Sequence, residues 1–332
     1  MNKYFNGELE LMSNSQKKTL FTKLKANKVV TAQMHTDETN FLNDVLLNKF
    51  NDYLSAYINT VEEKSFKYSS LFKINTPKTA DVYKTIQSIS TDLVTINGFT
   101  NPLVPWRLSD NQLSFSFLIS GINFTNNVTG IVHTVYTMIT TVLEVENELF
   151  LQIDLDNLPI AFRRNEDTFF NDKIALIKDY LEGTFNWEIE GLDLSLLLDQ
   201  YRVQNTVPKL AAQKMILSTG GQATLDSSIS KDIVLPIIGE LKALLDENEA
   251  ILNKCSEVRK LLLDFIETTE AEADIPWSTF IWEAKTKSKS IQIKFILNSN
   301  FDYTLLNYYA HTNGRGGMED VTRKIIKEYL AI

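Results

Sequence analysis

"LSFSFLIS", residues 113–120, decides the fold class, because large apolar side chains alternate there with small or polar ones. A period of two is typical of a strand with one buried and one exposed face. The stretch "GIVHTVYTMITTVLEV" at 130–145 is dense in β-branched residues, which favour strands. After the break "ENE", "LFLQIDL" at 149–155 reads as the return strand. We therefore expect an antiparallel meander in the middle of the chain.

The segments on either side of this meander add helices and further strands. "FFNDKIALIKDYLEG" at 169–183 has a helical period, and "STFIWEA" at 278–284 and "SIQIKFIL" at 290–297 have the character of strands. The chain closes with the amphipathic segment "MEDVTRKIIKEYLA". The predicted fold class is α+β, with antiparallel sheet(s), packed helices and one long central helix. The proline-rich loop "NGFTNPLVPWR" at 97–107 predicts a boundary between a mixed α/β region, 1–108, and an α+β domain, 109–332.

The long helix is predicted over residues 232–269, where apolar residues recur at alternating steps of three and four. This spacing is a heptad pattern, and Asn248 is its polar member. Two interpretations fit: a central helix of a monomeric bundle, or a dimer helix in which paired Asn248 side chains fix the register. The candidate dimer residues are Leu241, Leu244, Asn248, Ile251 and Val258.

Composition and charge limit the class of protein. The 332 residues carry a formal net charge of −9, which disfavours a uniformly basic surface but leaves room for a local basic patch. The single cysteine, Cys255, excludes an internal disulfide and fits a reducing compartment. No window approaches about 18 uninterrupted apolar residues, and the first residues lack the apolar core of a signal peptide. We expect a cytoplasmic protein without direct membrane insertion.

One pattern points to metal chemistry. Asp154 and Asp156 end the "LFLQIDL" strand two residues apart, so that period two puts both carboxylates on one face. Such a pair can hold Mg²⁺ for a metal-dependent nuclease or nucleotidyl enzyme. No third ligand can be assigned from the sequence, and aspartates at strand ends also cap turns. The three histidines are far apart in the sequence and form no zinc motif.

A second pattern points to nucleic acid. The turn "HTNGRGGMED" at 311–320 fits neither the Walker loop nor the dinucleotide fingerprint, but it projects Arg315. Residues 283–332 carry eight Lys or Arg against five Asp or Glu, which reverses the sign of the chain as a whole. Sequence-independent contacts to double-stranded DNA would suit such a region, and solvated basic residues around a glycine-rich turn are the alternative. The candidate contacts are Lys285, Lys287, Lys289, Arg315, Arg323 and Lys324.

The order of features from residue 149 onward resembles a known family. The strand "LFLQIDL", the turn "AFRR", the helix "DKIALIKDYLEG", the segment "VQNTVPKLAAQKMIL" and the late strand "IQIKFILNSN" carry the resemblance. Together they resemble the DNA-binding component B of the Kiwa anti-phage defence system. The resemblance covers about the last 190 residues. It implies a cytoplasmic protein that oligomerises, binds DNA and works with a membrane-embedded partner, and it supplies no catalytic residues.

The leading hypothesis from the sequence is a non-enzymatic DNA-binding defence protein that acts as a homodimer with a membrane-associated partner and needs no cofactor. The first alternative is the Mg²⁺-dependent enzyme that uses Asp154 and Asp156. The second is a protein-interaction module of a phage or mobile element, without DNA binding.

Overall fold

The computed structural model describes most of the chain in two compact units. The described residues are 9, 12, 14–29, 37–62, 66–75, 79–89, 94–96, 103–125, 128–163, 168–204, 207–217, 221–226, 236–283, 290–309 and 314–332. The first unit comprises Met1–Leu192 and Asn313–Lys327, and the second comprises Asp193–Thr312 and Glu328–Ile332. The predicted boundary at residue 108 is corrected, because it lies inside a strand whose partner follows immediately.

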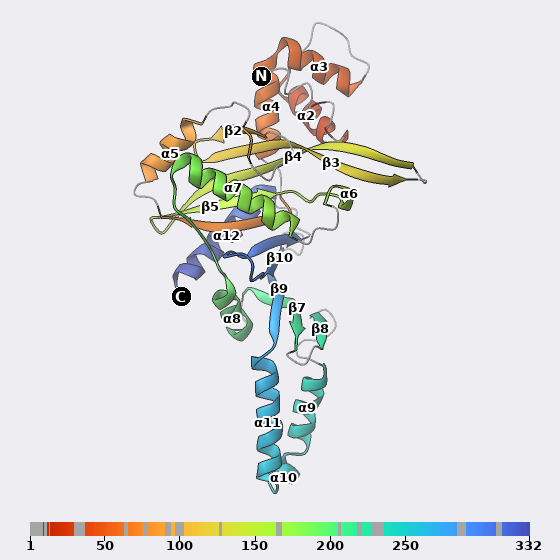
Figure 1. Cartoon of the computed structure of the whole chain (residues 1–332), viewed down its shortest axis with the longest axis vertical. Coiled ribbons are helices and arrows are strands. Elements are labelled where there is room, and N and C mark those ends of the chain that lie inside the picture. The colour runs from red at the N-terminus through yellow and green to blue at the C-terminus, as the bar shows by residue number, and fades with distance from the viewer. Residues whose placement is uncertain are drawn as a thin grey trace. The chain divides into compact units, whose positions relative to one another are not determined.

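The predicted meander forms the sheet of the first unit (Figure 1). Its strands run in the order β2-β3-β4-β5-β1, each antiparallel to its neighbour, and β6 also pairs with β1. The strands are β1 (Tyr68–Ile74), β2 (Leu103–Ser109), β3 (Gln112–Thr125), β4 (Val128–Val145), β5 (Glu148–Leu155) and β6 (Ile189–Gly191). Glu146 and Asn147 both have positive φ, the type I′ geometry that connects β4 to β5 in two residues.

Two helices cover opposite faces of this sheet. On one face, α7 (Phe169–Phe185) sets its Tyr180 ring edge-on against Phe115 of β3. On the other face, α12 (Gly314–Leu330) contacts Thr141 of β4. Because strand side chains alternate between faces, Phe115 and Thr141 lie on opposite sides. The remaining helices of this unit are α2 (Asn14–Ala26), α3 (Glu38–Asn48), α4 (Phe50–Glu62), α5 (Thr79–Gln87) and α6 (Ile160–Arg163).

The second unit contains another antiparallel series, in the order β11-β10-β9-β7-β8. Its strands are β7 (Lys209–Ile216), β8 (Gln222–Asp226), β9 (Asp274–Trp282), β10 (Ile291–Ile296) and β11 (Leu305–Tyr309). One face carries the buried rings of Phe280 and Phe295, and Tyr201 of α8 (Ser195–Gln204) packs edge-on against Phe280. The α+β class and the antiparallel sheet predicted from the sequence are confirmed.

The predicted continuous helix is corrected to a helical hairpin. Residues 236–271 form α9 (Pro236–Glu247), the short α10 (Glu249–Leu252) and α11 (Ser256–Ala271), which folds back beside α9 (Figure 1). At the first break, the Asn248 side chain donates 2.9 Å to the Leu244 carbonyl. We call residues 236–271 the arm. In the part of the chain that the structure describes, no helix could cross a lipid bilayer.

The arm buries a different apolar stripe from the one expected. Ile238, Leu245 and Ile266 form a buried cluster with Met215 of β7, whereas Leu244 is 54% exposed. Of the other predicted dimer residues, Leu241 and Asn248 are half-buried, and Ile251 and Val258 are exposed. Folding back lets the stripe of Ile238, Leu245 and Ile266 bury itself within one chain, which a straight helix would not allow.

Candidate nucleic-acid interface

Arg315, the centre of the predicted DNA surface, is buried inside the first unit. Its Nη2 donates 3.1 Å to Oδ2 of Asp154 and 2.5 Å to Oγ1 of Thr141, and its guanidinium lies 5.4 Å from the centre of the Phe66 ring. The Arg315 side chain is 10% exposed and that of Asp154 is 2% exposed. The expectation that Arg315 contacts DNA is therefore corrected: this residue ties α12 to the sheet.

The same ion pair argues against the predicted magnesium site. Asp154 also accepts 2.8 Å from Gln152 Nε2, and burial raises the pKa of its carboxyl although Arg315 and Gln152 act in the opposite direction. Asp156 lies beyond the end of β5 and accepts a hydrogen bond from the Asn157 amide. Within the described residues, no three His, Cys, Asp or Glu side chains come together. The two aspartates thus act in structure, one inside the sheet and one in a turn.

The other predicted contacts are divided between α12 and a connection. Arg323 pairs with Glu319 at 2.9 Å and donates 2.9 Å to the Glu144 carbonyl, so its charge is already engaged. Lys324 is exposed on α12. Lys285, Lys287 and Lys289 lie outside the described residues, in the connection between β9 and β10. The structure therefore does not bring the predicted set together as one surface.

A different basic group lies on the sheet of the second unit. Lys214 of β7 pairs across the sheet with Trp277 of β9, and Lys294 of β10 lies on the same face. The Lys294 ammonium is 3.7 Å from the centre of the Trp277 ring, a cation–π contact. All three residues are partly exposed, on the face opposite the buried Phe280 and Phe295. We call Lys214, Trp277 and Lys294 the basic face.

The charges of the basic face are not neutralised within the described part of the chain. Neither Lys214 nor Lys294 forms an ion pair with a described carboxylate. Burial lowers the pKa of the Lys294 ammonium, and the positive charge of Lys214 lowers it further. Two ammonium groups that repel each other in a partly desolvated place form an arrangement that a bound anion would relieve.

Neighbouring residues add hydrogen-bonding groups. Gln292 and Asn307 share this face of the sheet, on β10 and β11. At its edge, Lys209 pairs with Glu283 at 3.0 Å, so this lysine is neutralised while Lys214 and Lys294 are not. The arrangement offers two ammonium groups and amide donors to a phosphate backbone, contacts that do not depend on base sequence.

Sequence reasoning missed the basic face because its members come from three strands 63 and 17 residues apart, counting from Lys214 to Trp277 and on to Lys294. A signal existed in the alternation of "KLAAQKMI" and "IQIKFI", which places each lysine opposite the apolar positions. Which strands lie next to each other depends on long-range pairing, and the local pattern does not give that order.

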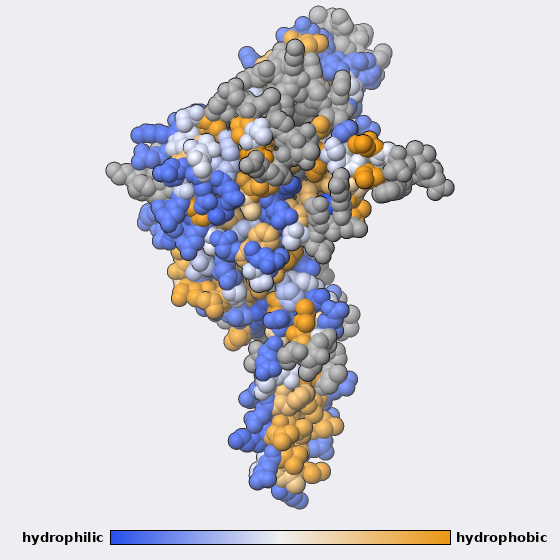
Figure 2. Space-filling view, in the orientation of Figure 1, coloured by the Kyte–Doolittle hydropathy of each residue, from blue (hydrophilic) through white to orange (hydrophobic). Residues whose placement is uncertain are grey.

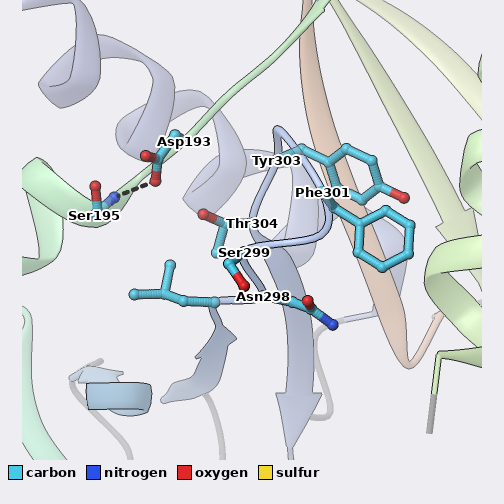
Figure 3. Close-up of a pocket in the computed structure, with 8 residues that line it drawn as sticks. Asp193, Ser195, Asn298, Ser299, Phe301, Tyr303 and Thr304 are labelled. Atoms are coloured by element: carbon cyan, nitrogen blue, oxygen red, sulfur yellow. Dashed lines mark hydrogen bonds between the residues drawn. The ribbon is translucent and has the colours of Figure 1, made fainter. Parts of the chain in front are cut away.

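The second unit also has a pocket of about 250 Å³ between the start of α8 and the β10–β11 connection (Figure 3). Asp193 accepts 2.9 Å from the Ser195 amide, and the hydroxyl groups of Ser299, Tyr303 and Thr304 are among the lining groups. No lysine or arginine lines this pocket, and Asp193 adds negative charge. It therefore suits an anion poorly, and we do not place the nucleic-acid contact there.

Comparison of the chain with protein-family models, with curated proteins and with solved structures gave no match.

Proposed function

We propose that this protein binds DNA through the basic face of its second unit. The observation that carries the proposal is the pair of lysines, Lys214 and Lys294, held on either side of Trp277 without a described carboxylate partner. Phosphate groups carry the complementary charge and supply most of the binding energy in sequence-independent DNA recognition.

Trp277 acts as a support for Lys294 in this proposal. Its ring lies under the Lys294 ammonium, which keeps the flexible lysine side chain in one place. Holding the cation before binding reduces the entropy lost when a phosphate arrives. Lys285, Lys287 and Lys289 join β9 to β10 in the sequence, and we include them as further contacts because both strands carry residues of the basic face.

The resemblance supplies the biological setting of the proposal. We place the protein in the cytoplasm, as a non-enzymatic component of an anti-phage defence system that works with a membrane-associated partner. The net charge of −9 requires that DNA approach through a local positive surface, and the basic face supplies one.

Charge reversal of the two lysines tests the proposal. We expect the double variant Lys214→Glu, Lys294→Glu to bind a fluorescein-labelled 30-base-pair duplex at least tenfold more weakly than the wild type, because each lysine's attraction to phosphate becomes repulsion. Fluorescence anisotropy at 50 mM and 150 mM salt measures the affinity, and a single strand of the same sequence shows which form is preferred.

The matched control is Lys49→Glu, Lys84→Glu, which changes the net charge equally on exposed lysines of the first unit. We expect less than a threefold loss for this control. Equal affinities for wild type and the Lys214, Lys294 variant, or equal losses for both variants, would show that DNA does not use the basic face.

A further inference from the structure

The arm leaves an apolar band without a partner in the described chain. Five of its large apolar side chains are more than half exposed: Leu244, Ile251, Val258, Leu261 and Phe265. Figure 2 shows the band running along the arm beside hydrophilic edges. Five side chains of roughly 150–200 Å² each, exposed to this degree, leave on the order of 500 Å² of apolar surface, which is typical of an interaction site.

The band lies on one side of the hairpin. Seven-residue steps separate Leu244, Ile251, Val258 and Phe265, which is the spacing of a helix-packing seam. On each helix the exposed leucine is next to the buried stripe: Leu245 follows Leu244, and Leu262, partly buried, follows Leu261. Because α9 and α11 run in opposite directions, these edges of the two helices lie on the same side of the pair.

Acidic residues border the band on both helices. Leu244 has Glu240 four residues before it and Glu247 three residues after it, and both glutamates are exposed. Leu261 repeats this arrangement on α11, with Glu257 four residues before it and Asp264 three residues after it, again exposed. Residues three and four apart are neighbours on a helix surface, so carboxylates lie beside each leucine.

We infer that the apolar band of the arm binds a basic amphipathic helix of a partner protein. The apolar face of that helix would cover the five exposed side chains, and Lys or Arg residues at its edges would face the four carboxylates. Such a helix would lie along α11, which is about 24 Å long at 1.5 Å per residue for its 16 residues. This inference does not depend on DNA binding.

Charge favours this partner over a second copy of the chain. The arm carries eight acidic and four basic residues, a net charge of −4, so two arms face to face would bring together −8. Their carboxylate borders would lie opposite each other, which like-charge repulsion opposes. A basic helix places opposite charges at the same positions and buries the same apolar surface.

Two synthetic helical peptides of 18 residues test the inference. Both carry leucines at the same heptad positions; one has lysines at the flanking positions and the other has glutamates. We expect the lysine peptide to bind the full-length protein at least tenfold more tightly, as measured by fluorescence anisotropy. The variant Leu244→Gln, Leu261→Gln, Phe265→Gln should bind neither, and Glu240→Gln, Glu247→Gln, Glu257→Gln, Asp264→Asn should lose the preference for lysine.

These substitutions are on exposed side chains, so the thermal unfolding midpoint checks that each variant is folded. Failure of the lysine peptide to bind, or equal binding of both peptides, would overturn the inference. Light scattering supplies the remaining outcome: a wild-type dimer that the three-residue glutamine variant dissociates would assign the band to a second copy instead.

Discussion

At the scale of single residues, Arg315 and Asp154 show why a local motif misleads. Each has the chemistry of a surface site, one for phosphate and one for a metal ion. In the folded chain they neutralise each other, 161 positions apart in sequence, beneath α12. The sequence contained both residue types but no sign that they would meet, because their contact depends on how the last helix packs on the sheet.

The Arg315–Asp154 pair should be essential for stability. We expect Arg315→Leu to lower the free energy of unfolding by about 3–5 kcal/mol, because it leaves the Asp154 carboxylate buried without its partner. The control is Arg323→Leu, which removes a partly exposed pair with Glu319 and should cost less than about 1 kcal/mol. Urea denaturation measures both. Similar losses for the two variants would mean that the buried pair does not stabilise the fold as described.

At the scale of elements, strands were predicted well and the arm was not. Alternation along "LSFSFLIS" fixes which side chains face the core, so β3, β4 and β5 could be predicted from sequence alone. The heptad spacing of the arm fits a straight helix and a hairpin equally well. Asn248 was interpreted as a register-fixing core residue, and it instead bonds to the Leu244 carbonyl where α9 ends.

Two adjacent leucines distinguish the hairpin from the straight helix. Leu245 is 6% exposed and packs with Ile238, whereas Leu244 is 54% exposed. We expect Leu245→Ala to cost about 2–4 kcal/mol of unfolding free energy, as truncations of buried leucines do, and Leu244→Ala to cost less than about 1 kcal/mol. Thermal and urea unfolding of both variants measure the difference. The reverse order of costs would favour the continuous helix with Leu244 inside.

At the scale of the whole molecule, an acidic chain carries two surfaces of opposite character. The basic face concentrates positive charge on one sheet of the second unit, and the arm concentrates negative charge around an apolar band. The sequence predicted DNA binding and a helical contact surface, but it placed Arg315 and Leu241 among the contacts. Long-range strand pairing and the fold-back of the arm decided the actual positions.

The salt dependence of DNA binding tests the central claim most directly. Neutralising two phosphate contacts should lower the magnitude of the slope of log Kobs against log salt concentration by about 2 for duplex DNA. We expect this change for Lys214→Gln, Lys294→Gln, measured by anisotropy from 50 to 300 mM NaCl, and no change for Lys49→Gln, Lys84→Gln. A slope for the Lys214, Lys294 variant equal to that of the wild type would contradict DNA binding by the basic face.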